Sequence, residues 1–186
     1  MDLVKTLENY KSYDEYEEAD KNAFLYFLKA FGDNAYTRSN LTGHIAVSAW
    51  VVNRQKNKVL MAYHNIYDSW AWLGGHADGD KDLLSVAVKE AVEESSIKNI
   101  KILSEYPIDI SAIGVIPHIK KGKVVPTHIH YNVVYFLEAD ESENVMAKAD
   151  ENQAVKWIRF EDVLKECKEE HMLPHYSRII KKMNLL

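Results

Sequence analysis

The segment from Gly74 to Ile97 constrains the fold more than any other, because it joins a glycine-rich turn to a strongly patterned run of residues. At about 100° per residue, a helix here would carry an apolar stripe of Leu84, Ala87, Val88 and Ala91. Glu90, Glu93 and Glu94 fall together on an adjacent face. Like charges this close disfavour a helix unless a cation neutralises them. The segment therefore predicts a packed helix whose acidic face either binds a divalent cation or is solvated.

Hydrophobic periodicity predicts the elements that precede this helix. Apolar residues recur every three or four positions from Tyr13 to Phe31, which is the period of an amphipathic helix. Gly32 to Asn34 supply a stop signal, and Thr37 to Asn40 are predicted to form a loop before the main domain. Strands are predicted at Ile45–Val52 and Lys58–Tyr63, joined as a hairpin by the polar turn Asn53–Asn57.

The remaining elements alternate between strand and helix. Further strands are predicted at Ile110–Ile116, His128–Leu137 and Val155–Ile158, with a hairpin tip at Lys120–Lys123. Helices are predicted at Lys81–Ser95, Phe160–Glu170 and His175–Met183, with Gly74–Asp80 as a loop before the first and Pro174 as a break before the last. This mixture predicts an α/β sandwich around a mixed sheet rather than a purely parallel one.

Length and composition bound the number of domains and the partners. The chain has 186 residues, 47% of them hydrophobic, which fits a single domain over residues 1–186, with residues 1–40 as a helical extension packed on it. The net charge of -5 provides no broad basic surface for long nucleic acid. A small phosphorylated substrate remains possible, because a bound divalent cation can supply positive charge.

Cysteine content and the N-terminal sequence predict the cellular setting. Cys167 has no second cysteine to pair with, so an intrachain disulfide and a cysteine-rich zinc site are both excluded. The stretch from Met1 to Asp20 has no apolar run of signal-peptide or membrane-span length. We therefore expect a cytoplasmic protein with no membrane partner, and a homodimer is left open.

The loop and helix from Gly74 to Ile97, which read GGHADGDKDLLSVAVKEAVEESSI, resemble the Nudix box. The pattern of that box is GX5EX7REUXEEXGU, in which U is an aliphatic residue. Aligned from the second glycine, the matching positions are Gly75, Glu90, Glu93, Glu94 and Ile97. The resemblance implies a Nudix-type α/β/α sandwich around a mixed sheet.

Three positions depart from the Nudix pattern: Lys81 replaces the first glutamate, Lys89 replaces arginine, and Ser96 replaces glycine. Lys89 keeps its charge but lacks the planar fork with which arginine holds a carboxylate. Ser96 is expected to adopt a left-handed conformation at a cost of about 1 kcal/mol. The missing acid could come from a nearby aspartate, namely Asp78, Asp80 or Asp82, and Asp82 could equally be the helix N-cap.

The resemblance implies hydrolysis of a nucleoside diphosphate linked to another group, with Mg²⁺ or Mn²⁺ as the cofactor. The implied metal ligands are Glu90, Glu93, Glu94 and the backbone carbonyl of Gly74. Glu93 or Glu94 is a candidate general base, since a free carboxylate can accept the proton of the attacking water. Glu151, in the polar loop before the Val155 strand, is a further catalytic candidate, and Lys89 is expected to support the glutamates.

Several residues are candidates for contacts with the substrate. His128 and His130 lie two apart on a predicted strand and therefore face the same side. The others are His76 and Asp78 in the box loop, together with Arg38 and His44. The alternative for the histidines is a polar strand face or hydrogen bonding within the fold. A separate structural zinc centre is not expected, because such a site needs four ligands and Cys167 is remote.

Two other functions compete with hydrolysis. An enzyme similar to isopentenyl-diphosphate isomerase shares the Nudix fold but is thought to need a catalytic cysteine, and Cys167 lies far along the chain from the box. A non-catalytic Nudix-like nucleotide-binding or regulatory domain is the second alternative, because of the changes at Lys81, Lys89 and Ser96. Retention of all three helix glutamates favours the hydrolase.

Overall fold

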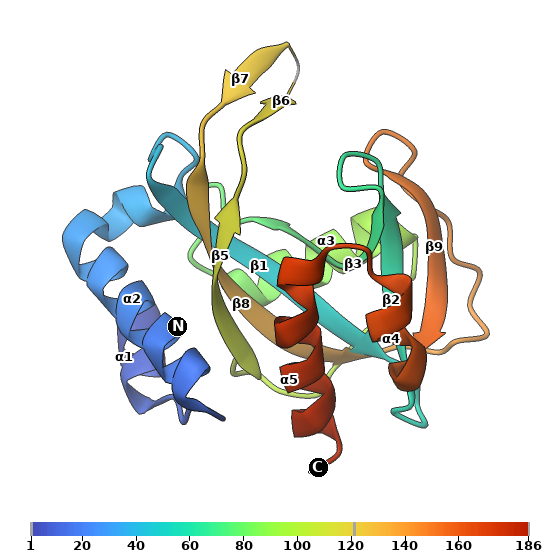
Figure 1. Ribbon diagram of the computed structural model, residues 1–186. Coiled ribbons are helices and arrows are strands. Elements are labelled where there is room, and N and C mark those ends of the chain that lie inside the picture. Colours follow the sequence, from blue (N-terminus) through green and yellow to red (C-terminus); the bar gives the residue numbers. More distant parts are fainter. Residues whose placement is uncertain (1, 121, 186) are drawn as a thin grey trace.

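Residues 2–120 and 122–185, which the computed structural model describes, form a seven-stranded mixed sheet with helices on both faces (Figure 1). The helices are α1 (Leu3–Asn9), α2 (Glu15–Phe31), α3 (Leu83–Ser95), α4 (Phe160–Glu166) and α5 (Leu173–Met183). Two short 3₁₀ segments lie at Gly32–Tyr36 and Glu170–Met172. No described helix is both long enough and apolar enough to cross a bilayer.

The strands β1 to β9 build the main sheet and one small ribbon. Their bounds are β1 (Gly43–Val52), β2 (Lys58–His64), β3 (Ser69–His76), β4 (Lys101–Ile102), β5 (Asp109–Val115), β6 (His118–Lys120), β7 (Lys123–Val125), β8 (His128–Glu138) and β9 (Asn152–Arg159). The sheet order is β4-β8-β1-β3-β2-β9, and β5 also pairs with β8. The pair β6 and β7 forms a separate ribbon that projects beyond the sheet (Figure 1).

Strand β1 lies at the centre of this architecture. It runs parallel to β8 and antiparallel to β3, and all ten of its residues are buried. Val47 and Ala49 join the core cluster that includes α2 and α3, whereas Trp50 and Val52 join the cluster that includes α4 and α5. A strand covered on both faces needs a nearly continuous apolar sequence, which is what Ile45 to Val52 provides.

The fold class is confirmed, but three local predictions need correction. The hairpin predicted from Ile45–Val52 and Lys58–Tyr63 has a single β1–β2 pair, Val52 with Val59, because β1 takes β3 and β8 as its partners. Residues 74–76 belong to β3 rather than to a loop, because they pair with β1. The helix predicted to reach Glu170 ends at Glu166. The predicted tip at Lys120–Lys123 includes residue 121, which lies outside the described residues.

The capping residues explain where the two longest helices begin and end. Asp14 caps α2 by accepting a hydrogen bond from the backbone nitrogen of Glu17, and Gly32 ends the helix with a positive φ of 52°. Asp82 caps α3 by accepting from the backbone nitrogen of Ser85 at 3.3 Å, which confirms its predicted N-cap role. Helix α1 was not predicted, because its seven residues contribute only two buried side chains.

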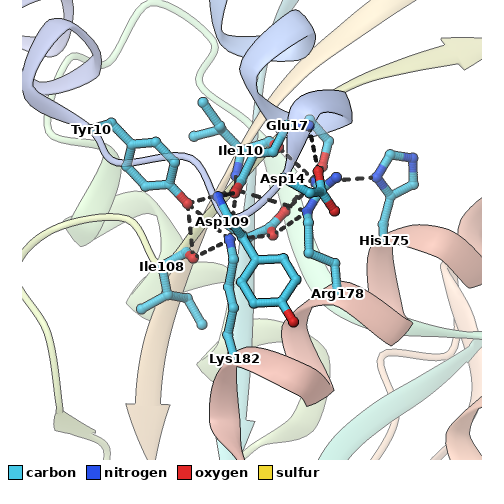
Figure 2. Close-up of polar contacts among 11 residues, drawn as sticks. Tyr10, Asp14, Glu17, Ile108, Asp109, Ile110, His175, Arg178 and Lys182 are labelled. Carbon is cyan, nitrogen blue, oxygen red and sulfur yellow. Dashed lines mark hydrogen bonds and ion pairs between the residues drawn. The ribbon is translucent and has the colours of Figure 1, made fainter. Parts of the chain in front are cut away.

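A buried network of charges attaches the N-terminal helices to the sheet and to α5 (Figure 2). Glu17 of α2 and Asp109 of β5 are fully buried, and Arg178 of α5 is 5% exposed. The Arg178 Nε and Nη2 atoms each donate to Asp109 at 2.8 Å, while Lys182 Nζ lies 2.6 Å from Glu17 Oε1. Tyr10 donates its hydroxyl to Glu17, and burial raises its pKa. The N-terminal segment is therefore held by specific polar contacts as well as by apolar packing.

Candidate functional site

A cavity of about 1160 Å³ opens over one face of the sheet. Its walls come from β1, β3, β5 and β8, from the β6–β7 ribbon, and from the start of α5. Glu94 of α3 and Asn152 of β9 also reach it. The cavity thus joins the end of the acidic helix to the polar ends of the central strands.

Glu94 is the most deeply placed of the three helix glutamates. Its side chain is 5% exposed, and it accepts hydrogen bonds from the Gly74 backbone nitrogen at 2.7 Å and from Asn152 Nδ2 at 3.0 Å. Burial raises the pKa of Glu94 to about 7, although these two hydrogen bonds act in the opposite direction. Burial also raises the pKa of Glu90, and the neighbouring charges of Glu93 and Glu151 raise it further.

The positive charges near this acidic cluster contact its outer members. Lys89 Nζ lies 3.7 Å from Glu93, and Lys148 Nζ lies 3.8 Å from Glu93 and 3.2 Å from Glu151. Within residues 2–120 and 122–185, no ion pair of 4.0 Å or less reaches Glu90 or Glu94. A group of carboxylates left partly uncompensated is the oxygen-rich donor set that suits Mg²⁺ or Mn²⁺, so these residues fit a divalent cation.

The two glycines of the box lie against different partners. A Cβ atom added at Gly75 would lie 2.5 Å from the Glu90 carboxyl carbon, so only glycine leaves that carboxylate in place. A Cβ atom added at Gly74 would overlap the Val47 carbonyl oxygen and lie 2.9 Å from Ser48 Cα in the neighbouring strand. One glycine therefore makes room for a functional side chain, and the other for the backbone of β1.

We expect Gly75→Ala and Gly74→Ala to separate these two requirements. In Gly75→Ala the flexible Glu90 side chain moves aside, so Mn²⁺ binding should weaken by roughly tenfold or more while the melting temperature changes little. In Gly74→Ala the β1 backbone must shift, which should cost about 1–3 kcal/mol of unfolding free energy. Calorimetric Mn²⁺ titration and thermal unfolding followed by circular dichroism measure the two effects. Equal loss of stability in both variants would contradict this distinction.

The departures from the Nudix pattern have clear local partners. Lys81 contacts Asp33 at 2.6 Å, so it ties the box loop to the segment after α2 rather than to the helix glutamates. Ser96 has φ 59° and ψ 13°, which confirms the expected left-handed conformation. Its backbone nitrogen donates to Val92 O at 2.8 Å and so ends α3. Serine therefore adopts here the left-handed backbone conformation that glycine adopts at a lower cost in free energy.

The aspartates considered for the missing acid are engaged elsewhere. Asp78 forms a two-point pair with Arg38 at the cavity rim, with Arg38 Nε to Asp78 Oδ1 at 2.7 Å. Asp80 Oδ1 accepts from the backbone nitrogen of Asp82 at 2.8 Å, and Asp82 caps α3. Arg38 and Asp78 thus lie together, as candidates for one part of the substrate site.

Four histidines meet inside the cavity from three neighbouring strands. His44 comes from β1, His76 from β3, and both His128 and His130 come from β8. The strand register explains this, because His44 lies opposite His130, and Ala46 pairs with His76. His128 and His130 lie on the same face, as their two-residue spacing predicted. The sequence could propose each residue separately, but only strand pairing brings His44 and His76 to the other two.

His44 has an environment unlike that of an ordinary surface histidine. Its side chain is only 6% exposed, and neither ring nitrogen reaches hydrogen-bond geometry with a described residue. Burial and the nearby His128 lower the pKa of His44 to about 4, against a weaker opposing effect from the Asn40 backbone. The ring is therefore neutral at neutral pH, and its centroid lies 4.9–5.0 Å from those of His76, His128 and His130.

Asn152 and Glu169 line the cavity but were not predicted from the sequence. Asn152 positions Glu94 through the hydrogen bond described above, and nothing in its local sequence indicates this contact. Burial raises the pKa of Glu169 to about 7, and its side chain is 14% exposed. Both residues depend on tertiary packing, because they lie far from the box in the sequence.

Glu169→Gln is expected to change how stability depends on pH. The pKa of Glu169 is higher in the folded protein than in the unfolded protein. Below about pH 4.5 the carboxyl is neutral in both states, so its burial does not lower the free energy of unfolding. As pH rises through about 7 the buried carboxyl ionises, and the free energy of unfolding falls. The variant should therefore be more stable than the parent at pH 8, by on the order of 2 kcal/mol, and equal to it at pH 4.5. Urea unfolding at both pH values checks this, with the exposed neighbour variant Glu170→Gln as control. A parallel shift at both pH values would contradict the assignment.

Comparisons with known proteins agree with this geometry. The family model described as NUDIX domain matches residues 42–179. An RNA pyrophosphohydrolase of Pelagibacter ubique is 30% identical over 121 residues, covering 61% of this chain and 75% of that protein.

Solved structures show the same fold. A NUDIX-family hydrolase from Clostridium perfringens has a TM-score of 0.55 at 22% identity, covering 75% of this chain and 97% of that one. The E. coli dihydroneopterin triphosphate pyrophosphohydrolase has a TM-score of 0.56 at 13% identity, covering 74% and 95%. With the family model spanning most of the sequence and Glu94 of the box in the wall of a cavity, this chain belongs to the Nudix hydrolase family.

Proposed function

We propose that this Nudix hydrolase cleaves a diphosphate linkage in a nucleoside diphosphate joined to another group, and that it requires Mg²⁺ or Mn²⁺. The observation that supports this most directly is the crowding of Glu90, Glu93, Glu94 and Glu151 near one another, with Glu94 in the wall of the cavity. The proposed ligands are the three helix glutamates and the backbone carbonyl of Gly74. When bound, a divalent cation there would offset phosphate charge and acidify the attacking water.

In this proposal the side chains near the metal ligands orient those ligands and accept the proton of the attacking water. Glu94 is oriented by two hydrogen bonds, from Gly74 and Asn152, which suits a ligand that must keep one position. Glu93 is less buried, with 41% of its side chain exposed, and can accept the proton from the attacking water. Glu151 is the second candidate base. Lys89 holds Glu93 at a single point rather than through a fork, so it supports the cluster loosely.

The cavity is large and chemically mixed, which supports a nucleotide-sized substrate. Its apolar wall includes Leu41, Ile66 and Tyr67, and these can contact a base or another flat group. On the polar side, Arg38 lies at the rim and His76 follows the box glycines, so both are candidates for phosphate oxygens. Asp78, His44, His128 and His130 complete the proposed substrate side. We also propose that residues 1–186 act as one domain, with residues 1–40 as its packed extension.

A substrate screen with purified protein tests this proposal. The compounds should include nucleoside triphosphates, nucleotide sugars, ADP-ribose, dinucleotides and a short RNA with a 5′-triphosphate, each with Mg²⁺, with Mn²⁺ and with excess chelator. The RNA is included because the relative from Pelagibacter ubique is named an RNA pyrophosphohydrolase. We expect cation-dependent release of phosphate or pyrophosphate from small nucleotides. Equal turnover in chelator would contradict the metal requirement, and hydrolysis of the RNA alone would contradict the small-molecule class.

The isomerase alternative receives little support from Cys167. Its side chain is 6% exposed, and burial raises its pKa, so the reactive thiolate is disfavoured. The Cys167 Sγ atom contacts Ser69 Oγ at 3.6 Å, and among the described residues Cys167 is not part of the cavity wall. Adding isopentenyl diphosphate to the screen, with products identified by NMR, separates isomerase from hydrolase. Binding of nucleotides without turnover would instead favour a regulatory domain.

The cellular location and the oligomeric state of the protein stay predictions. We expect a cytoplasmic enzyme without a membrane partner, and either a monomer or a homodimer. Fractionation of cells that produce the protein and light scattering of the purified chain address these two points.

A further inference from the structure

The histidine cluster, defined as His44, His76, His128 and His130, brings imidazole nitrogens close together. One nitrogen from each of His44, His76 and His130 can be chosen so that all three lie within 4.8 Å of one another. The Nε2 atoms of His76 and His130 are 3.3 Å apart, and those of His128 and His130 are 3.1 Å apart. The centroids of neighbouring rings in the cluster are 4.9–5.0 Å apart.

These separations match the spacing of ligands around one metal ion. Zinc binds histidine nitrogen at about 2.0–2.1 Å with tetrahedral geometry, which places two ligand nitrogens about 3.3–3.4 Å apart. The His76 and His130 pair already has this separation. The three nitrogens of His44, His76 and His130 lie within 4.8 Å of one another, so side-chain rotation would have to bring the wider separations down to that of the His76 and His130 pair when a cation binds.

Hydrogen bonding among the rings does not explain the arrangement fully. His130 Nε2 lies between His76 Nε2 and His128 Nε2, and one nitrogen carries either one proton or one lone pair. It therefore cannot make a good hydrogen bond to both neighbours at once. A metal ion can accept lone pairs from several imidazoles together, so it satisfies a geometry that a shared proton does not.

Two further features favour a metal over a purely polar strand face. His44 is only 6% exposed, and neither of its ring nitrogens makes a hydrogen bond of standard geometry with a described residue. His128 Nδ1 lies 2.8 Å from the Pro126 carbonyl oxygen, which can only accept, so Nδ1 carries the proton. Metal-ligating histidines typically donate their second ring N–H in this way. In His128 the arrangement leaves a lone pair on Nε2, which lies 3.1 Å from His130 Nε2.

We propose that His44, His76 and His130 form a second metal site in the cavity, for Zn²⁺ or another first-row ion that prefers nitrogen ligands. His128 lies at the edge of this site, with its Nε2 3.1 Å from that of His130. Imidazole suits such ions, whereas Mg²⁺ prefers the oxygens of the carboxylate cluster, so the two sites select different metals. Three protein ligands leave one position open toward the cavity, where a phosphate oxygen or water can bind.

This site differs from the structural zinc centre that the sequence argued against. It lacks cysteine, it lines a cavity rather than a closed core, and it stays compatible with histidines that act on the substrate. The inference rests on the histidine geometry and not on the proposed hydrolysis. Metal binding can therefore succeed or fail independently of the activity screen.

Metal binding to the full-length protein tests the proposal. The Glu94→Gln variant is used, because this substitution weakens metal binding at the carboxylate cluster. The variant is stripped of metal with a chelator, dialysed, and titrated with Co²⁺ and with Zn²⁺. We expect one tightly bound ion per chain, with the intense visible absorption of four-coordinate Co²⁺, and a rise in melting temperature on adding Zn²⁺. Added pyrophosphate should change the Co²⁺ spectrum by entering the open position.

Three histidine variants and a matched control complete the test. His76→Ala and His130→Ala should each weaken Zn²⁺ binding by at least about a hundredfold, more than the loss of an outer-shell partner. His44→Ala should do the same, but it is buried, so the other two keep the test valid if it fails to fold. His118→Ala is the control, because its ring lies 6.3 Å from that of His128. Tight Zn²⁺ binding retained in both His76→Ala and His130→Ala, or absent from the parent protein, would overturn the proposal.

Discussion

Replacing Glu94 with glutamine is expected to lower diphosphate hydrolysis by roughly a hundredfold or more while leaving the protein folded. Glu94 is the buried member of the acidic cluster, and both of its oxygens hold fixed hydrogen bonds. Glutamine preserves the shape but removes the negative charge, so the divalent cation is held less tightly where phosphate charge must be offset. Steady-state rates over a range of Mn²⁺ concentrations measure the loss, which excess metal should relieve in part.

The stability of the metal-free variant distinguishes a functional role from a structural one. Removing the charge relieves repulsion with Glu90, whereas replacing one carboxylate oxygen by an amide leaves either Gly74 or Asn152 without its acceptor. These effects oppose each other, so the melting temperature should change by only a few degrees. Glu105→Gln, in an exposed loop, is the control for a lost carboxylate elsewhere. Unfolding of metal-free Glu94→Gln at ordinary temperature would mean that Glu94 is primarily structural.

Replacing Asp109 with alanine is expected to cause the largest loss of stability. Asp109 is fully buried and accepts from Arg178 and from Lys182 at 2.8 Å, as Figure 2 shows. Without it, the buried Arg178 and the partly buried Lys182 keep Glu17 as their common ion-pair partner among the described residues. Breaking a buried ion pair by removing one partner typically costs about 3–5 kcal/mol. In a chain of this size that corresponds to a melting temperature lower by about 6–20 °C.

An exposed ion pair provides the matched control for this second prediction. Arg159 Nη1 and Glu161 Oε1 are 3.1 Å apart, but their side chains are 62% and 69% exposed. Glu161→Ala should therefore change stability little, because water already solvates both charges. Chemical unfolding followed by circular dichroism compares the two variants. If Asp109→Ala is no more destabilising than Glu161→Ala, the network does not hold α2 and α5 to the sheet.

Within the candidate site, the helix was predictable because its information is local. The spacing of Glu90, Glu93 and Glu94 along a 3.6-residue period places them on one face whatever the helix packs against. Ser96 could likewise be assigned a left-handed conformation, because the turn that ends such a helix requires it. Asp82 was correctly identified as a possible cap from its position before the apolar stripe.

The sequence by itself thus determined the α/β class, most of the helices and strands, and the acidic helix, since each depends on the period of side chains along a continuous segment. Tertiary structure alone decided which strands became neighbours. Strand β1 took β8 and β3 as partners rather than β2 over most of its length, and that choice placed His44 beside His130 and His76. It also buried Asn152 against Glu94 and paired Asp109 with Arg178. These contacts join residues separated by 32 to 86 positions, and no local periodicity encodes them, because they form only when the strand pairings and buried charges of the whole chain are satisfied together.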